Sequence, residues 1–261
     1  MIKVTPNMNF SSSIARGTIK TRELLTEELN EKVFHNVLQV YDKKNTCGIG
    51  AIKTRFNRVL PENKNVNIKP LPLKDYDICG GTTVIEDNNI ELTGYSIEIP
   101  VNKRKKFCII DLPEFMHEST HIIDWLLNPK YVANYRKMCD KDIFSKDCYD
   151  IYHKIYDEPD FMAKPSKHLF GIIKDKTKKA VNDLPFDEKI TFLKFLKFRM
   201  ELENHAYKEE VRFAKLMKKL GKKVDSVSMV DYSNYMKIPQ KINIIKEIIS
   251  EEITKERQLS K

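Results

Sequence analysis

The spacing of hydrophobic and polar residues divides the chain into a short β region flanked by amphipathic helices. Between Thr82 and Ile110, β-branched residues alternate with polar ones or form short runs broken by turn residues, which predicts strands. Elsewhere the hydrophobic residues recur every three to four positions, the spacing of one helix face. The predicted strands are Thr82–Glu86, Ile90–Thr93, Tyr95–Val101 and Phe107–Ile110, and the predicted helices are Arg22–Asp42, Leu112–Leu127, Pro129–Met138, Lys141–Tyr156, Lys167–Val181, Asp187–Leu220 and Gln240–Arg257.

This order of elements predicts an α+β fold, with a small, mixed, twisted sheet of short strands followed by a central helix and a mostly helical C-terminal half. We expect one domain over residues 1–261. Its parts would be a helical N-terminal portion (1–60), the sheet with the central helix (80–125) and a helical portion (129–261). Glu62–Gly81 contains two prolines and ends on two glycines, so we expect a loop there.

The central helix carries the residues most indicative of chemistry, His117-Glu118-Ser119-Thr120-His121. On a helix, this H-E-x-x-H pattern places two imidazoles one turn apart on one face. Two such rings can bind one Zn²⁺, and the glutamate beside the first can act on a water at the metal. The pattern therefore favours a zinc-dependent peptidase.

The residues around the motif indicate a buried helix. Asp111 suits the helix start and Asn128-Pro129 the stop. Hydrophobic residues cover most of the helix surface, and His117, His121 and Asp124 share the remaining line. Buried polar side chains need partners. A metal would supply one, and the alternative is a hydrogen-bonded pair of core histidines with Asp124 as acceptor.

A catalytic zinc requires a third protein ligand, and the long helix at Asp187–Leu220 offers the best candidates. Glu203 continues a line of hydrophobic residues, so it lies where a core residue would be expected. Glu201 has lysines for neighbours, which indicates a solvated position. We therefore predict Glu203 as the ligand, with an inward glutamate paired to Arg or Lys as the alternative reading. His205 points away from Glu203 around the helix and is a weak candidate.

H-E-x-x-H followed by a later helix with Glu203-x-x-Ala206 resembles the gluzincin metallopeptidases, in particular anthrax lethal factor and related bacterial toxin and effector proteases. The resemblance covers these two helices and the strands before them. It implies one Zn²⁺ held by His117, His121 and Glu203, and Glu118 as the general base. Asp124 is an alternative ligand, but three ligands from one straight helix would strain tetrahedral geometry, so we expect it to orient an imidazole instead. We expect Tyr207 as a donor to the oxyanion, or else as an aromatic core residue.

The same resemblance implies that an edge strand binds the extended substrate by strand addition. We assign this role to the strand with Tyr95, Ile97 and Ile99, because Pro100 lacks an N–H and suits an edge. The expected partner is thus a protein or peptide substrate. The sequence defines neither the identity of this substrate nor the oligomeric state.

Composition adds alternatives. With 41% hydrophobic and 32% charged residues, 261 residues can form a substantial core. The net charge of +9 raises the alternative of a basic helical binding module, although we expect no nucleic-acid partner because no such motif is present. A zincin that binds a partner without cutting it is a third reading, which the intact Glu118 argues against.

The cysteines and the N-terminus bear on location. Five scattered cysteines indicate reduced thiols, and neither a signal peptide nor a membrane-spanning segment is expected. We therefore expect a cytosolic-type protein, which a dedicated bacterial secretion system could deliver into a host cell. A housekeeping peptidase is the alternative.

Overall fold

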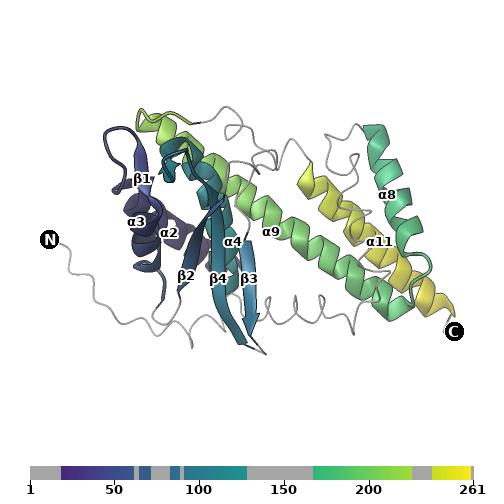
Figure 1. Cartoon of the computed structure of the whole chain (residues 1–261). Helices are drawn as coiled ribbons and strands as arrows, with labels where there is room; N and C mark the ends of the chain where they lie inside the picture. Colours follow the sequence, from purple (N-terminus) through teal and green to yellow (C-terminus); the bar gives the residue numbers. More distant parts are fainter. Residues whose placement is uncertain are drawn as a thin grey trace. The chain divides into compact units, whose positions relative to one another are not determined.

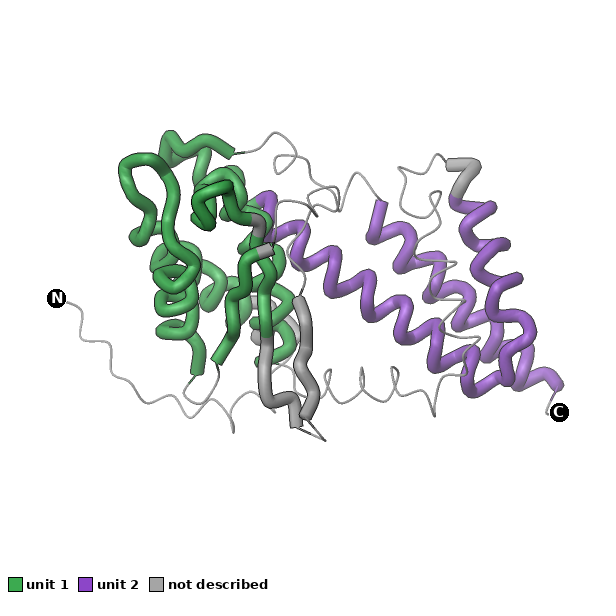
Figure 2. Tube along the Cα trace, in the orientation of Figure 1, with its two compact units in different colours: residues 1–127, 212–228 green, residues 128–211, 229–261 purple. Residues whose placement is uncertain are grey.

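The computed structural model describes residues 19–61, 65–71, 83–88, 91–127, 167–224 and 237–259, and these confirm the α+β class. Their contacts form two compact units (Figure 2). Unit 1 comprises residues 1–127 and 212–228, and unit 2 comprises residues 128–211 and 229–261. Helix α9, Phe186–Lys219, runs without a break from one unit into the other. The expectation of a single domain stays a prediction, because one helix belongs to both units.

Unit 1 contains a three-stranded sheet in the order β2-β4-β3 (Figure 1). The strands are β2, Val66–Leu71, β3, Thr83–Asn88, and β4, Glu91–Pro100. β4 pairs in parallel with β2 and antiparallel with β3, and a β-bulge at Glu86/Asp87 shifts the second register. Such a bulge lets a strand bend without losing its partner.

The prediction that Tyr95, Ile97 and Ile99 belong to an edge strand is wrong. Ile97 pairs with Ile68 on one side of β4 and with Thr83 on the other, so β4 is the central strand. Its backbone groups are therefore used within the sheet. Ile97 and Ile99 are buried in the core, and Ser96 on the opposite face is buried too. Among the strands described, β2 and β3 form the edges.

Three elements were missed. They are β1, Thr46–Gly48, α3, Ile49–Asn57, and β2, which lies inside the predicted loop Glu62–Gly81. β2 contains Pro70, a residue that a strand tolerates at a sheet edge because no backbone donor is lost there. The absence of an N–H in proline underlies the prediction that Pro100 marks an edge strand. Among the described strands it is β2, with Pro70, that lies at an edge and fits this reasoning.

The helix with the H-E-x-x-H motif is α4, Leu112–Leu127, as predicted. A 3₁₀ turn, Ile109–Asp111, leads into it from β5, Lys106–Cys108, which pairs antiparallel with β1. The start of α4 is fixed by aromatic packing. The ring of Phe115 contacts those of Phe56 and Phe107 edge-to-face at centroid distances of 5.7 and 5.9 Å. All three rings are buried.

Within the described part of unit 2 there are three helices, which are α8, Lys167–Val181, the first part of α9, and α11, Ile238–Leu259. Their apolar faces form one core that includes Ile173, Leu193, Leu196 and Ile245. The predicted end of α9 is confirmed. Gly221 has a φ of 68°, and the N–H groups of Gly221 and Lys222 donate to the carbonyls of Lys218 and Met217, a Schellman motif. The helices predicted at Pro129–Met138 and Lys141–Tyr156 lie outside the described residues.

Candidate metal centre

The two histidines of α4 point their Nε2 atoms at the same place. These atoms lie 3.2 Å apart, with the ring centroids separated by 4.9 Å and the ring planes inclined by 79°. Both side chains belong to the core of unit 1, with 7% of each residue exposed. Two nitrogen atoms so close either share a proton in a hydrogen bond or face a common cation.

The spacing fits a tetrahedral metal. With Zn–N bonds of about 2.0–2.1 Å and tetrahedral angles, two ligand nitrogens are about 3.3 Å apart. The observed 3.2 Å lies close to this value. A side-chain rearrangement is therefore not needed for both imidazoles to bind one ion.

Glu203, the predicted third ligand, lies close to both histidines. The candidate ligand atoms of His117, His121 and Glu203 all lie within 4.8 Å of one another. Arg199, one turn earlier on α9, approaches the Glu203 carboxylate at 3.7 Å. This contact is longer than a charge-assisted hydrogen bond of about 2.7–2.9 Å. The alternative ion pair is thus present as a loose contact, and a carboxylate has two oxygens with which to accept an arginine and a metal.

Glu201 behaves as the sequence indicated. Its carboxylate accepts a hydrogen bond of 2.8 Å from Lys197, and its side chain is 42% exposed, against 15% for Glu203. Two glutamates separated by one residue therefore have different surroundings on α9. This difference makes them a matched pair for experiment.

The C-terminal part of α9 is anchored within unit 1. Phe213 stacks on Phe34 of α2, Ile19–Leu38, at a centroid distance of 4.7 Å, and both rings are fully buried. Glu203 lies ten residues before Phe213 on the same unbroken helix, about 15 Å along its axis.

Helix α2 also holds the polar side of α4. Thr26 donates a hydrogen bond of 3.1 Å to Oδ1 of Asp124, and Asn30 donates one of 3.0 Å to the hydroxyl of Thr120. All four side chains are buried. Asp124 is therefore fixed by a neighbouring helix, and its predicted role in orienting an imidazole stays a prediction.

Sequence reasoning missed Thr26 and Asn30. A signal was present, because they lie four residues apart on the line of α2 that continues with the buried Val33 and Val37. Polar residues on a core line call for polar partners across the interface. Two further acidic residues on α9, Glu209 and Glu210, are also buried and were not singled out.

The remaining predicted residues have distinct surroundings. Glu118 is buried beside His117 on α4, rotated by about 100° around the helix. Tyr207 is half-buried and packs against the hydrophobic core of unit 2. This packing agrees with the alternative reading of Tyr207 as an aromatic core residue, and its role toward an oxyanion stays a prediction.

Two other expectations concern the cysteines and membranes. Cys47 and Cys108 are free thiols, whereas Cys79, Cys139 and Cys148 lie outside the described residues. Among the helices that the structure describes, none combines the length and the apolar character needed to cross a membrane.

Comparison of the chain with protein-family models, with curated proteins and with solved structures finds no match. A proposal for the function of the protein therefore rests on the geometry of the candidate metal centre.

Proposed function

We propose that the protein is a zinc-dependent peptidase that hydrolyses a peptide bond within a protein substrate. One observation carries the proposal. The ligand atoms of His117, His121 and Glu203 gather within 4.8 Å, and the buried Glu118 adjoins the first histidine. The histidines and Glu118 come from one helix and Glu203 from another, as in the zincins that the motif resembles.

The set of donors supports zinc. Two imidazoles and one carboxylate form a three-ligand set that leaves the fourth tetrahedral position open, the arrangement of catalytic rather than structural zinc sites. When bound, zinc would lower the pKa of a coordinated water and polarise the carbonyl of the scissile peptide. The carboxylate of Glu203 offsets part of the charge of the ion, which two neutral imidazoles alone would leave in a buried site.

Glu118 is the residue that we assign to proton transfer. Its carboxylate accepts a proton from the attacking water and then delivers that proton to the amine of the departing peptide. Its neighbour in sequence, His117, is a predicted ligand, which supports a position of the base close to the metal-bound water. A glutamine at residue 118 would keep the shape of the side chain but could not accept the proton.

The sheet offers a revised site for the substrate strand. β3 is an edge strand among the described residues, it pairs antiparallel with β4, and both strands contact α4. An extended peptide can add to such an edge through backbone hydrogen bonds. We therefore assign the substrate to the edge of β3 in place of the strand with Tyr95, Ile97 and Ile99.

The experiment that tests the proposal compares the parent with Glu118→Gln. We expect both proteins to bind one zinc per chain, and we expect only the parent to cleave a diverse peptide library. Loss of a general base typically lowers the rate by about 10²–10⁴-fold. Glu114→Gln, one turn earlier on α4, is the matched control and should keep both zinc and activity.

Each other result points elsewhere. A parent that binds zinc and leaves every peptide intact would favour a zincin that binds its partner without cutting it. A parent without zinc would favour a basic binding module. Iron in place of zinc would contradict the proposal, because two histidines and a carboxylate also form the ligand set of iron oxygenases.

A further inference from the structure

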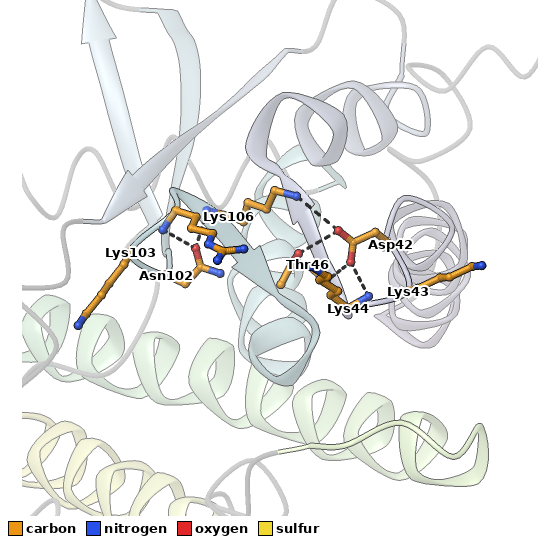
Figure 3. Close-up of a pocket in the computed structure, with 8 residues that line it drawn as sticks. Asp42, Lys43, Lys44, Thr46, Asn102, Lys103 and Lys106 are labelled. Carbon is orange, nitrogen blue, oxygen red and sulfur yellow. Dashed lines mark hydrogen bonds and ion pairs between the residues drawn. The ribbon is translucent and has the colours of Figure 1, made fainter.

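A basic pocket of about 610 Å³ lies in unit 1 between two loops, residues 42–46 and 102–106 (Figure 3). The first loop joins α2 to β1, and the second joins β4 to β5. β1 and β5 pair antiparallel, with Thr46 opposite Cys108 and Gly48 opposite Lys106, so the loops enter this ladder from opposite ends. The ladder is three residues long, and Nζ of Lys106 in the second loop lies 3.4 Å from the carboxylate of Asp42 in the first. The mechanism proposed above makes no use of this pocket.

The two loops have the same conformation. In the first, Oδ1 of Asp42 accepts hydrogen bonds from the N–H groups of Lys44 and Thr46, at 2.8 and 3.0 Å. In the second, Oδ1 of Asn102 accepts them from the N–H groups of Arg104 and Lys106, at 2.9 and 3.1 Å.

The backbones of the loops match as well. The fourth residue of each loop, Asn45 or Lys105, has a φ of 56°. The first and fifth residues are joined by one backbone hydrogen bond in each loop, of 3.0 Å from Asp42 to Thr46 and 2.9 Å from Asn102 to Lys106. Both loops are thus closed, well-bonded turns that hold their second and third residues outward.

The residues so presented are all cationic. Lys43 and Lys44 occupy the second and third positions of one loop, and Lys103 and Arg104 occupy those of the other. Lys106 also lines the pocket, 3.4 Å from the Asp42 carboxylate. Asp42 is the one acidic residue in the lining, and hydrogen bonds from Thr46 and Lys44 hold the pKa of its carboxyl below its usual range. The lining therefore carries five cationic side chains and one carboxylate, which leaves an excess of positive charge in the pocket.

The arrangement of the cations indicates the shape of the ligand. Figure 3 shows Lys43 and Lys103 extending to opposite sides, with Lys44 and Lys106 between them. Charges that extend to both sides of the pocket suit an extended chain with several carboxylates better than one compact anion. Among the described residues that line the pocket there is no aromatic ring, so these residues lack the stacking surfaces of single-stranded nucleic-acid sites. They also include no apolar side chain to enter a membrane.

The pocket lies within reach of α4. From Lys106 the chain passes through β5, the 3₁₀ turn and the first turns of α4, so Lys106 and His117 are at most about 24 Å apart. A fully extended peptide covers this distance with about seven residues. The separation thus falls within the span of one short stretch of substrate chain.

We infer that this pocket binds an acidic segment of the protein substrate, rich in Asp and Glu and within about seven residues of the cleaved bond. The inference rests on the proposed peptidase function for its biological meaning. The binding of an acidic peptide does not depend on cleavage. Experiments can therefore contradict the inferred binding without contradicting the peptidase function, and the reverse.

The test uses the full-length Glu118→Gln protein and a fluorescein-labelled hexaglutamate peptide. Fluorescence anisotropy measures the affinity of the peptide for this protein and for the same protein carrying K43Q/K44Q/K103Q/R104Q. The matched control removes four exposed lysines of unit 1 instead, K215Q/K218Q/K219Q/K223Q. A second pocket variant, K43R/K44R/K103R/R104K, keeps every charge. Circular dichroism establishes that all variants are folded.

We expect the neutralised pocket variant to bind hexaglutamate at least tenfold more weakly, and the control and the charge-retaining variant to bind as the Glu118→Gln protein does. Binding should weaken as the ionic strength rises from about 0.01 M to about 1 M, where the screening length falls from about 30 Å to about 3 Å. In the active protein, neutralising the pocket should raise KM for a substrate with an acidic segment and leave cleavage of a neutral peptide unchanged.

Several results would overturn the inference. They are equal losses in the pocket and control variants, an unchanged affinity in the pocket variant, and pocket-dependent binding of phosphatidylserine vesicles or single-stranded DNA without binding of hexaglutamate. If the parent lacks zinc and cleaves nothing, the proposed function fails, while the anisotropy measurement still decides whether the pocket binds acidic peptides.

Discussion

The Nε2 atoms of His117 and His121 lie 3.2 Å apart inside a buried helix. A buried cluster of nitrogen and oxygen ligands is stabilised when a cation takes the place of the water lost on folding. Ligand binding to the folded state adds stability of about 2.7 kcal/mol when the free ligand is at 100 times its Kd.

We therefore predict that zinc raises the melting temperature of the protein and that a chelator reverses the rise. His117→Ala should abolish this shift. His35→Ala replaces an exposed histidine of α2 and should keep it. Calorimetry with and without zinc makes the measurement, and an equal shift in parent and His117→Ala would show that the ion binds elsewhere.

The hydrogen bond from Thr26 to Asp124 makes a prediction about stability. Thr26→Val keeps the shape of the side chain but leaves a buried carboxylate without this donor, so we expect a loss of about 1–3 kcal/mol in the free energy of unfolding. Thr254→Val, which removes an exposed hydroxyl bonded to the Ser250 carbonyl, is the control and should change little. Urea denaturation measures both. A neutral Thr26→Val would mean that α2 does not hold Asp124 through this bond.

The aromatic packing under α4 makes a second prediction about stability. Phe115 is buried between Phe56 and Phe107, and its replacement by alanine opens a cavity at the start of the helix. We expect Phe115→Ala to lower the free energy of unfolding by about 3–5 kcal/mol. Leu259→Ala at the exposed end of α11 serves as the comparison, with a change near zero. A small effect of Phe115→Ala would contradict the packing described here.

Much of the helical structure could be predicted from the sequence, because local signals mark it. The 3.6-residue pattern, Pro113 near the start and Asn128 after the end define α4, and Gly221 marks the end of α9. The short elements β1, α3 and β2 were missed because their order depends on pairing with distant residues. β1, for example, is three residues long and becomes a strand through β5.

In the candidate site, too, the features set by local sequence could be predicted and those set by long-range packing could not. The spacing of His117 and His121 is a local property of one helix, and the choice of Glu203 over Glu201 followed from the hydrophobic pattern of another. The placement of β4 could not be read in this way, since a strand with alternating residues is equally compatible with an edge or a centre. The contacts of Thr26 and Asn30 with α4 depend on how two helices pack, which no sequence spacing specifies.

Lys241 makes a prediction about pH. This lysine is 1% exposed among the isoleucines of α11, and burial lowers its pKa from 10.5 to about 8. Between these pH values the unfolded chain binds the proton and the folded protein does not, so the free energy of unfolding of the parent should rise with pH. Methionine does not titrate, so the free energy of unfolding of Lys241→Met should rise less with pH than that of the parent.

The measurement is urea denaturation at several pH values between about 7 and 10, with the difference between the two proteins taken at each pH. We expect the stability of Lys241→Met relative to the parent to fall as the pH rises toward 10, because the cost of burying a charge disappears when the parent loses the proton. A difference that is constant across this range would contradict the lowered pKa.

The central claim is that His117, His121 and Glu203 bind one zinc ion, and the matched glutamates of α9 test it most directly. The measurement is zinc per chain by mass spectrometry after dialysis, in the parent, in Glu203→Gln and in Glu201→Gln. We predict one zinc in the parent and in Glu201→Gln, and a large loss of zinc in Glu203→Gln. Full zinc in Glu203→Gln, or none in the parent, would contradict the claim.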